Sequence, residues 1–198
     1  YPKAPVILAS DGALYGTTTG GGVGQVGTVF RVDPATGAAT VAHHFGPDGN
    51  ARQPKGGVIE ATDGALYGLT WDGGAEDRGF VYKLDKAGTG YTVLHPFSVD
   101  HRDAQRGVGE LVEGRNGVLY GVTFAGGEYG GGTIFRIAKD GSGYELLHHF
   151  ILTQEGVDGA APKAGLIEGQ DGALYGTTAQ GGVGSAYGTV FRLNRDGT

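Results

Sequence analysis

The chain of 198 residues contains no cysteine and no methionine. Without cysteine it can form no disulfide, carry out no thiol chemistry and build no cysteine-based metal site. Because methionine is absent even at position 1, we expect the chain either to begin after a cleavage, such as the loss of a secretory signal, or to be an excerpt of a longer protein. No run of about 18 consecutive apolar residues occurs, so the sequence predicts no membrane-spanning helix and no membrane insertion.

Positive charge is also scarce. Lys and Arg number 15 against 21 Asp and Glu, which gives a formal net charge of −6. An acidic chain without a cluster of Lys and Arg repels phosphate backbones, so we expect no nucleic acid and no anionic membrane as a partner. Apolar residues with the period of an amphipathic helix are absent from every window, and the sequence therefore favours an all-β fold.

Glycine is in excess, with 42 residues, and it recurs at fixed places within an internal repeat. The motif DGALYGTT occupies residues 11–18 and again 171–178, with the variants DGALYGLT at 63–70 and NGVLYGVT at 116–123. The four copies follow one another at intervals of about 52 residues, a period typical of a solenoid, a propeller or an array.

Each repeat is predicted to contain four short strands, exemplified by residues 165–169, 173–178, 188–193 and, in the third repeat, 144–150. These segments are rich in β-branched and aromatic residues and are bounded by Gly, Asp or Asn. A DG or NG pair between the first two strands predicts a tight hairpin. Antiparallel units of four strands that repeat radially predict a single β-propeller domain of four blades, one from each repeat: 1–53, 54–106, 107–161 and 162–198.

The last repeat stops after its third strand, and three interpretations of this edge stay open. The ring closes with one three-stranded blade, a neighbouring molecule covers the edge, or the chain is an excerpt of a longer array. Unpaired strand edges accept further strands, which gives the second interpretation a physical basis.

The pattern PKAGLIEGQDGALYGTT at 162–178, with the glycine pair and GTVFRL that follow it and LHHF at 147–150, resembles the choice-of-anchor tandem repeat. This repeat is also called the Gloeo/Verruco repeat, and the resemblance covers essentially the whole chain. It implies a large bacterial surface or secreted protein, an extracellular location and a propeller-like fold. The family supplies no catalytic motif to transfer, and the departures at Gly107, Asn116 and residues 79–82 are conservative for a turn or a strand.

Residues that recur in the repeats are expected to build the frame. The tyrosine of the second strand fills the space between blades and bonds its hydroxyl locally, and the aromatic residue of the third strand lies in the core. These two sets are Tyr15, Tyr67, Tyr120 and Tyr175, and Phe30, Tyr82, Phe135 and Phe191. The recurrent His43, His95 and His148 belong to different blades and are too far apart to share a metal, so we expect no metal and no cofactor.

Residues that occur once, on the loops that vary between repeats, are expected to carry function. Aromatic side chains beside carboxylates and Arg are typical of carbohydrate sites, although an ordinary polar loop has the same composition. The candidate ligand-binding residues are Trp71, Asp72, Glu76, Asp77, Arg78, His101, Arg102, Asp103, Glu128 and Tyr129.

The sequence therefore favours a non-catalytic extracellular module with a structural or binding role. Its partner would be a glycan, or a second copy or neighbouring repeat that completes the last blade. The alternative is a carbohydrate-active enzyme. A glycoside hydrolase would need two carboxylates about 5–9.5 Å apart, drawn from Glu76, Asp77 and Asp103. A polysaccharide lyase would use His101 or Tyr129 as its base and Arg102 to neutralise a uronate. None of the motifs G-x-S-x-G, H-E-x-x-H or the P-loop supports either enzyme.

Overall fold

The computed structural model describes residues 1–46, 51–100, 102–151, 159–182 and 187–198. Within these ranges the chain forms strands and turns and no helix, which confirms the predicted all-β fold. The described residues therefore provide no helix that could cross a membrane.

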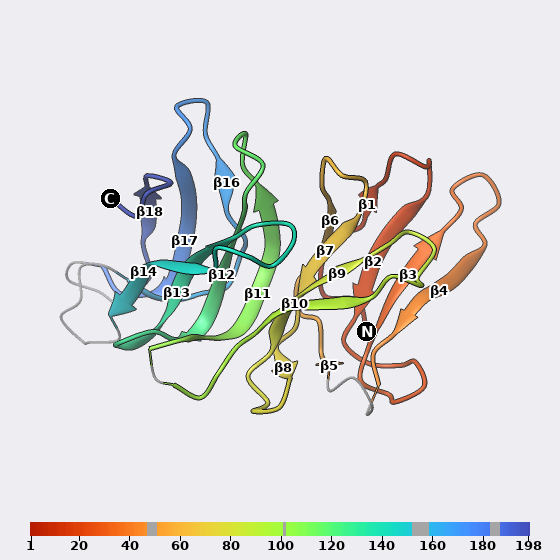
Figure 1. Ribbon diagram of the computed structural model, residues 1–198, viewed down its shortest axis with the longest axis horizontal. Helices are drawn as coiled ribbons and strands as arrows, with labels where there is room; N and C mark the ends of the chain where they lie inside the picture. Colours follow the sequence, from red (N-terminus) through yellow and green to blue (C-terminus); the bar gives the residue numbers. More distant parts are fainter. Residues whose placement is uncertain (47–50, 101, 152–158, 183–186) are drawn as a thin grey trace.

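The described strands form four antiparallel sheets, numbered here in chain order, and each sheet corresponds to one repeat (Figure 1). Sheet 1 contains β1 (Ile7–Leu8), β2 (Leu14–Thr18), β3 (Thr28–Val32) and β4 (Ala39–His44). Sheet 2 contains β6 (Val58–Glu60), β7 (Leu66–Leu69), β9 (Phe80–Leu84) and β10 (Thr92–Pro96). Sheet 3 contains β11 (Ala104–Glu113), β12 (Leu119–Gly126), β13 (Gly130–Ile137) and β14 (Glu145–Ile151). Sheet 4 contains β15 (Ala160–Pro162), β16 (Ile167–Glu168), β17 (Leu174–Gln180) and β18 (Val190–Leu193), and a separate pair joins β5 (Ala51–Arg52) to β8 (Asp72–Gly73).

Sheet 4 is one strand narrower than the others, as the sequence predicts. β15 and β16 follow each other along one edge of β17, where β15 pairs Pro162 with Thr178 and β16 pairs Ile167 with Tyr175. The single strand β11 takes the same course beside β12, pairing Gly107 with Thr123. β18 lies on the other edge of β17, and in the described residues no further strand pairs with it.

The hairpins between the first two strands of each sheet are built by the repeated Asp-Gly or Asn-Gly pair. In the first repeat Gly12 has a φ of 78°, a conformation that side chains disfavour, and the Asp11 carboxylate accepts a hydrogen bond from the Ala13 N–H. The equivalent glycines Gly64, Gly117 and Gly172 have φ values of 76°, 76° and 78°. These turns lie together at the top of Figure 1, whereas β5 and β8 lie at the bottom with the variable links.

The apolar core lies between the sheets, in three clusters that each join two consecutive repeats. Side chains alternate along a strand, so Leu66 of β7 packs toward sheet 1 and Tyr67 packs toward sheet 3. The third cluster joins sheet 3, through residues such as Ile134, to Leu166 and Leu193 of sheet 4. The recurrent tyrosines Tyr15, Tyr67 and Tyr120 are fully buried between sheets, which confirms their predicted role in the frame.

Each of these apolar interfaces also contains polar contacts that join the two sheets, named here the polar clip. The Glu60 carboxylate of sheet 2 accepts hydrogen bonds from the N–H and the hydroxyl of Ser10 in sheet 1, each at 2.6 Å, and also contacts the Lys86 ammonium. The pattern recurs one repeat later, where Glu113 accepts from the N–H and hydroxyl of Thr62 and from Lys139. Between sheets 3 and 4, Glu168 accepts from the Arg115 N–H and pairs with Arg195.

Repeat 1 lacks the residues that build this clip. Leu8 stands at the position of Glu60 and Pro34 at that of Lys86. Ala39 likewise replaces Tyr91, whose ring stacks on His43 of the preceding sheet at 4.2 Å between centroids. The outer face of sheet 1 therefore lacks the carboxylate, the ammonium group and the tyrosine ring with which sheet 2 contacts sheet 1.

The four sheets do not close into a ring within this chain. Sheet 1 and sheet 4 lie at opposite ends of the row of sheets (Figure 1). Val190 of sheet 4 is 81% exposed, although its equivalents Val29, Val81 and Ile134 are buried, and Val6 of sheet 1 is 46% exposed. The four antiparallel sheets, one from each repeat, confirm a propeller-like arrangement, while the number of blades in a complete ring stays a prediction.

We expect Gly121→Ala to destabilise the protein, because the second strand of sheet 3 passes directly over an aromatic ring. A Cβ at Gly121 would lie 2.5 Å from Cζ of Phe135 and 2.7 Å from Cδ2 of Leu111. Such overpacking lowers the free energy of unfolding by about 1–3 kcal/mol, which urea denaturation measures. The control is Gly46→Ala, whose Cβ would have no atom within 4 Å. Equal stability of the two variants would contradict this description of the core.

Candidate functional site

The described residues line an open cavity of about 370 Å³ to which all four repeats contribute, named here the axial pocket. All four repeats contribute to its lining, which consists of Lys3, Thr19, Gln53, Lys55, Trp71, Val108, Gly109, Phe124 and Lys163. Two repeat positions supply most of these residues. Lys3, Lys55, Val108 and Lys163 occupy one position, directly after the recurrent Pro or Gly, and Thr19, Trp71 and Phe124 occupy the other, at the end of the second strand.

The aromatic part of the axial pocket is formed by Trp71 and Phe124, whose ring centroids lie 5.1 Å apart. The Lys55 ammonium lies 3.2 Å from the centroid of the Trp71 ring, and the Arg106 guanidinium lies 5.3 Å from it. Both distances are typical of cation–π contacts. The single tryptophan of the chain is therefore already in contact with two cationic groups.

Burial affects the charged groups around Trp71 in opposite directions. Burial lowers the pKa of the Lys55 ammonium, and the positive charge of Arg106 lowers it further, although the Asp72 carboxylate opposes both. Burial also raises the pKa of Asp72, and the neighbouring Asp77 adds to that increase. Each shift indicates that the charged form of these side chains is incompletely solvated at the pocket.

The backbone that leads to Lys55, Val108 and Lys163 is bent by an uncommon conformation at three equivalent positions. Gln53, Arg106 and Ala161 each precede the recurrent Pro or Gly and have φ values of 52°, 62° and 53°. Non-glycine residues adopt positive φ in only a few per cent of cases, and they do so where surrounding contacts hold them. Here the Gln53 N–H donates to the Val26 carbonyl and the Arg106 N–H to the Arg78 carbonyl.

Of the predicted site residues only Trp71 lines the axial pocket. Asp72 does not line it but interacts electrostatically with Lys55 and Arg106, and the other candidates are dispersed. Asp77 accepts hydrogen bonds from Arg52 and from the Gly73 N–H, and Glu76 accepts one from the Val99 N–H. Both carboxylates therefore join the 71–78 loop to neighbouring loops. Arg78 precedes the buried Gly79 in the same loop.

The remaining candidates lie apart from the axial pocket. Glu128 lines a separate cavity of about 400 Å³ beside β12 and β13, and the neighbouring Tyr129 is 51% exposed. Arg102 is exposed, and its N–H donates to Asp100. His101 lies outside the described residues.

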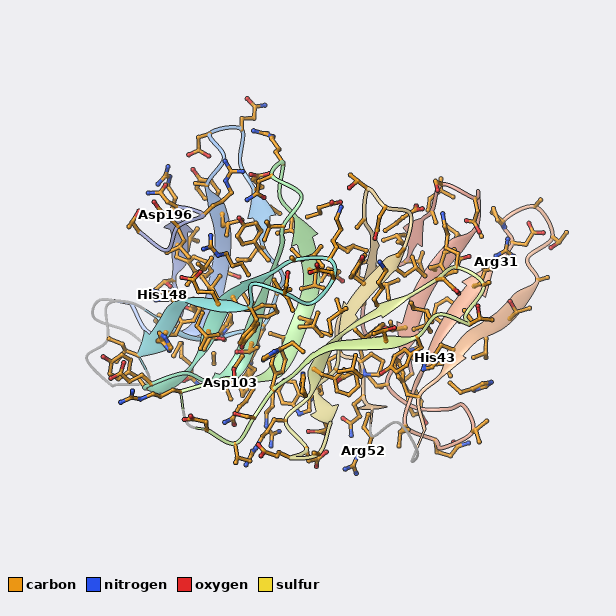
Figure 2. The ribbon with its side chains drawn as sticks, viewed as in Figure 1. Arg31, His43, Arg52, Asp103, His148 and Asp196 are labelled. Atoms are coloured by element: carbon orange, nitrogen blue, oxygen red, sulfur yellow. The ribbon has the colours of Figure 1, made fainter. Side chains whose placement is uncertain are left out.

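Asp103, predicted as a ligand-binding residue, instead joins sheet 2 to sheet 3 (Figure 2). Its carboxylate accepts hydrogen bonds from the N–H groups of Ser98 and Ala104 at 2.8 and 2.7 Å and from the Tyr144 hydroxyl at 2.7 Å. The Tyr144 ring also stacks on His95, with 3.5 Å between centroids. Burial alone would raise the pKa of Asp103, but its neighbours His95 and Tyr144 and the two N–H donors lower it to about 2.

The sequence reasoning missed most of the axial pocket. Lys3, Lys55 and Lys163 recur after a repeated proline and are therefore absent from a search among residues that occur once. Phe124 escaped the same search, although it aligns with Trp71 at the end of the second strand. A search for recurrent positions whose side chains point toward the common axis would have found these residues.

Comparison with known proteins places the whole chain in one repeat family. The sequence model of the Gloeobacter/Verrucomicrobia repeat matches residues 1–198. No curated protein matches the chain.

Several solved structures share the propeller-like fold at low identity. A chain of a nidogen/laminin complex has a TM-score of 0.63 at 16% identity, covering 96% of this chain and 59% of that chain. The extracellular domain of a hybrid two-component system from B. thetaiotaomicron has a TM-score of 0.61 at 10% identity, covering 94% and 20%. A gluconolactonase from Xanthomonas campestris has a TM-score of 0.58 at 18% identity, covering 98% and 58%. The present chain thus spans between a fifth and three fifths of these chains, and the likeness concerns the fold alone.

We expect the stability contributed by Asp103 to disappear in acid. Its pKa is about 2 in the folded chain against an ordinary value of 3.8, so the carboxylate stabilises the fold above pH 4 and loses this effect as the pH falls toward 2. Asp103→Asn should therefore lower the free energy of unfolding by about 2 kcal/mol at pH 7, and this difference from the natural chain should shrink as the pH approaches 2. Urea denaturation over this pH range measures it. A difference that does not change with pH would show that Asp103 stabilises the fold by some other means than its charge.

Proposed function

Because the chain belongs to the Gloeobacter/Verrucomicrobia repeat family, we propose that it is a non-catalytic β-propeller repeat module that binds a carbohydrate in the axial pocket. It supplies four blades of the propeller and acts outside the cell. The observation that carries this proposal is the convergence of two aromatic residues and three lysines on one cavity built by all four repeats: Trp71, Phe124, Lys3, Lys55 and Lys163. Ligand sites are typically concave, largely apolar and equipped with a few polar groups, and this cavity has that composition.

The frame around the axial pocket suits binding without large rearrangement. The recurrent residues are committed to packing between sheets, and the polar clips fix the spacing of consecutive repeats. A rigid frame reduces the entropy lost when a ligand binds.

The carboxylates required by the enzyme alternative have structural partners. Glu76, Asp77 and Asp103 all accept hydrogen bonds from backbone N–H groups. A glycoside hydrolase needs one carboxyl group with a raised pKa as its acid and a second one facing the sugar. The pKa of Asp103 is shifted in the opposite direction, so this residue is unsuited to act as the acid.

We expect Trp71→Ala to weaken saccharide binding about 10-fold or more, which corresponds to about 1.4 kcal/mol, because the substitution removes the main aromatic surface of the pocket. Isothermal titration calorimetry with a panel of neutral and acidic oligosaccharides measures the affinities. The matched control is Tyr129→Ala, since Tyr129 is an exposed aromatic residue that does not line the axial pocket. Absence of binding to every saccharide would refute the proposal, and cleavage products that accumulate with time would favour the enzyme.

A second role, self-association, is favoured by the open face of sheet 4. Val190, Ile167 and Tyr187 are 81%, 68% and 90% exposed on or beside this sheet. Within the chain, the equivalent face of sheet 1 packs against Val58, Leu66 and Tyr82, which come from the first three strands of sheet 2. We propose that the open face of sheet 1 of a second copy, which carries Val6 and Leu8, covers it in a head-to-tail contact. Because sheet 1 lacks the residues of the polar clip, this contact would consist of apolar packing alone.

We expect light scattering to detect association of the natural chain at high concentration and its loss in Val190→Glu, because a charge would be buried in the contact. The matched control is Val23→Glu, since Val23 is also 81% exposed but lies in a loop of repeat 1. A natural chain that stays monomeric at every concentration would refute this second role.

A further inference from the structure

Half of the lysines in this acidic chain converge on the axial pocket. The sequence contains six lysines, of which Lys3, Lys55 and Lys163 line the cavity. Each of the other three forms an ion pair: Lys83 with Asp63, Lys86 with Glu60 and Lys139 with Glu113. Within the part of the chain that the structure describes, no carboxylate lies within 4.0 Å of the three pocket ammonium groups.

The cations of the pocket outnumber the carboxylates near it. Arg106 adds a fourth positive charge beside Trp71. Asp72 interacts with Lys55 and Arg106, and Glu110 follows Gly109 of the lining, where its carboxylate accepts from the Gly57 N–H at 3.3 Å. Four cations thus face two carboxylates in a chain whose overall charge is −6. A region of positive charge in a negatively charged chain attracts a negatively charged ligand.

The contacts of Trp71 disfavour a neutral ligand. A neutral sugar that stacks on the indole must displace the Lys55 ammonium from its position 3.2 Å above the ring. A ligand with a negative group can pair with that ammonium where it stands and place its apolar part against Phe124. The negative group also compensates the charges of Lys3 and Lys163, which come from the first and last repeats.

From this arrangement we infer that the ligand of the axial pocket is an acidic saccharide, whose carboxylate or sulfate group is held by Lys3, Lys55 and Lys163 and whose ring lies against Phe124. This inference rests on the proposed saccharide binding and names the class of saccharide. Because the lysines come from three repeats, the selectivity is a property of the assembled array and not of one repeat.

The test compares trigalacturonate with its methyl ester, which has the same rings without the charge. Trp71 is the only tryptophan, so its fluorescence reports binding directly. We expect the acid to bind about 10-fold or more tightly than the ester. The ratio of the two affinities should decrease when the salt concentration is raised from about 0.01 M to about 0.15 M, because the Debye length falls from about 30 Å to about 8 Å.

Single variants Lys3→Gln, Lys55→Gln and Lys163→Gln should each reduce the preference for the acid. Lys83→Gln, the control, should leave it unchanged because Lys83 pairs with Asp63 outside the pocket. Equal affinities for acid and ester would overturn the inference while leaving the proposed saccharide binding intact.

A second measurement keeps the inference testable if neither saccharide binds, an outcome that would count against the proposed function alone. Iodide and caesium quench tryptophan by collision, and a pocket rich in cations admits the anion more readily. We expect iodide to quench Trp71 more efficiently than caesium, with the difference reduced in Lys55→Gln and unchanged in Lys83→Gln. Equal quenching by the two ions would overturn the positive pocket on which the inference depends.

Discussion

The packing of each sheet against the next is the constraint on which the rest of the structure depends. A single repeat of this kind has two apolar faces and cannot bury either one by itself. Alternation along β7 sends Leu66 to one interface and Tyr67 to the other, so every internal repeat takes part in two clusters of the core. Packing between consecutive sheets thereby holds the residues of all four repeats around one cavity, the axial pocket.

The polar contacts between repeats determine how consecutive sheets are aligned more than they raise the free energy of unfolding. Partly exposed ion pairs such as Lys139–Glu113 contribute little free energy. Their carboxylates, however, also accept two hydrogen bonds from one residue of the preceding sheet, which permits a single register between the two sheets. Asp103 and Tyr144 reinforce the same junction from the variable side. These contacts therefore help to hold consecutive sheets, and the pocket lysines that they carry, in one relative position.

Local patterns in the sequence predict the strands well because their causes are local. The Asp-Gly pair at Asp11 and Gly12 dictates a hairpin wherever it occurs, and alternation of side chains assigns each tyrosine to an interface. Ring closure is set by the angle between sheets, which no short segment encodes. The site is predicted only in part, because Trp71 is unique whereas Lys55 is repeated. Asp103 has the composition of a binding residue, but its partner Tyr144 lies 41 residues away and becomes visible only in the folded chain.

The clip that joins consecutive repeats has a direction. Each internal repeat carries the acid and the base that contact the preceding repeat. It also carries the hydroxyl or N–H group that donates a hydrogen bond to the acid of the next repeat. Repeats 2 and 3 therefore carry both halves of the clip, and unequal recombination that duplicates either one creates a junction that already has its acid, its base and an N–H donor. A gene of this design can lengthen or shorten by whole blades in one step.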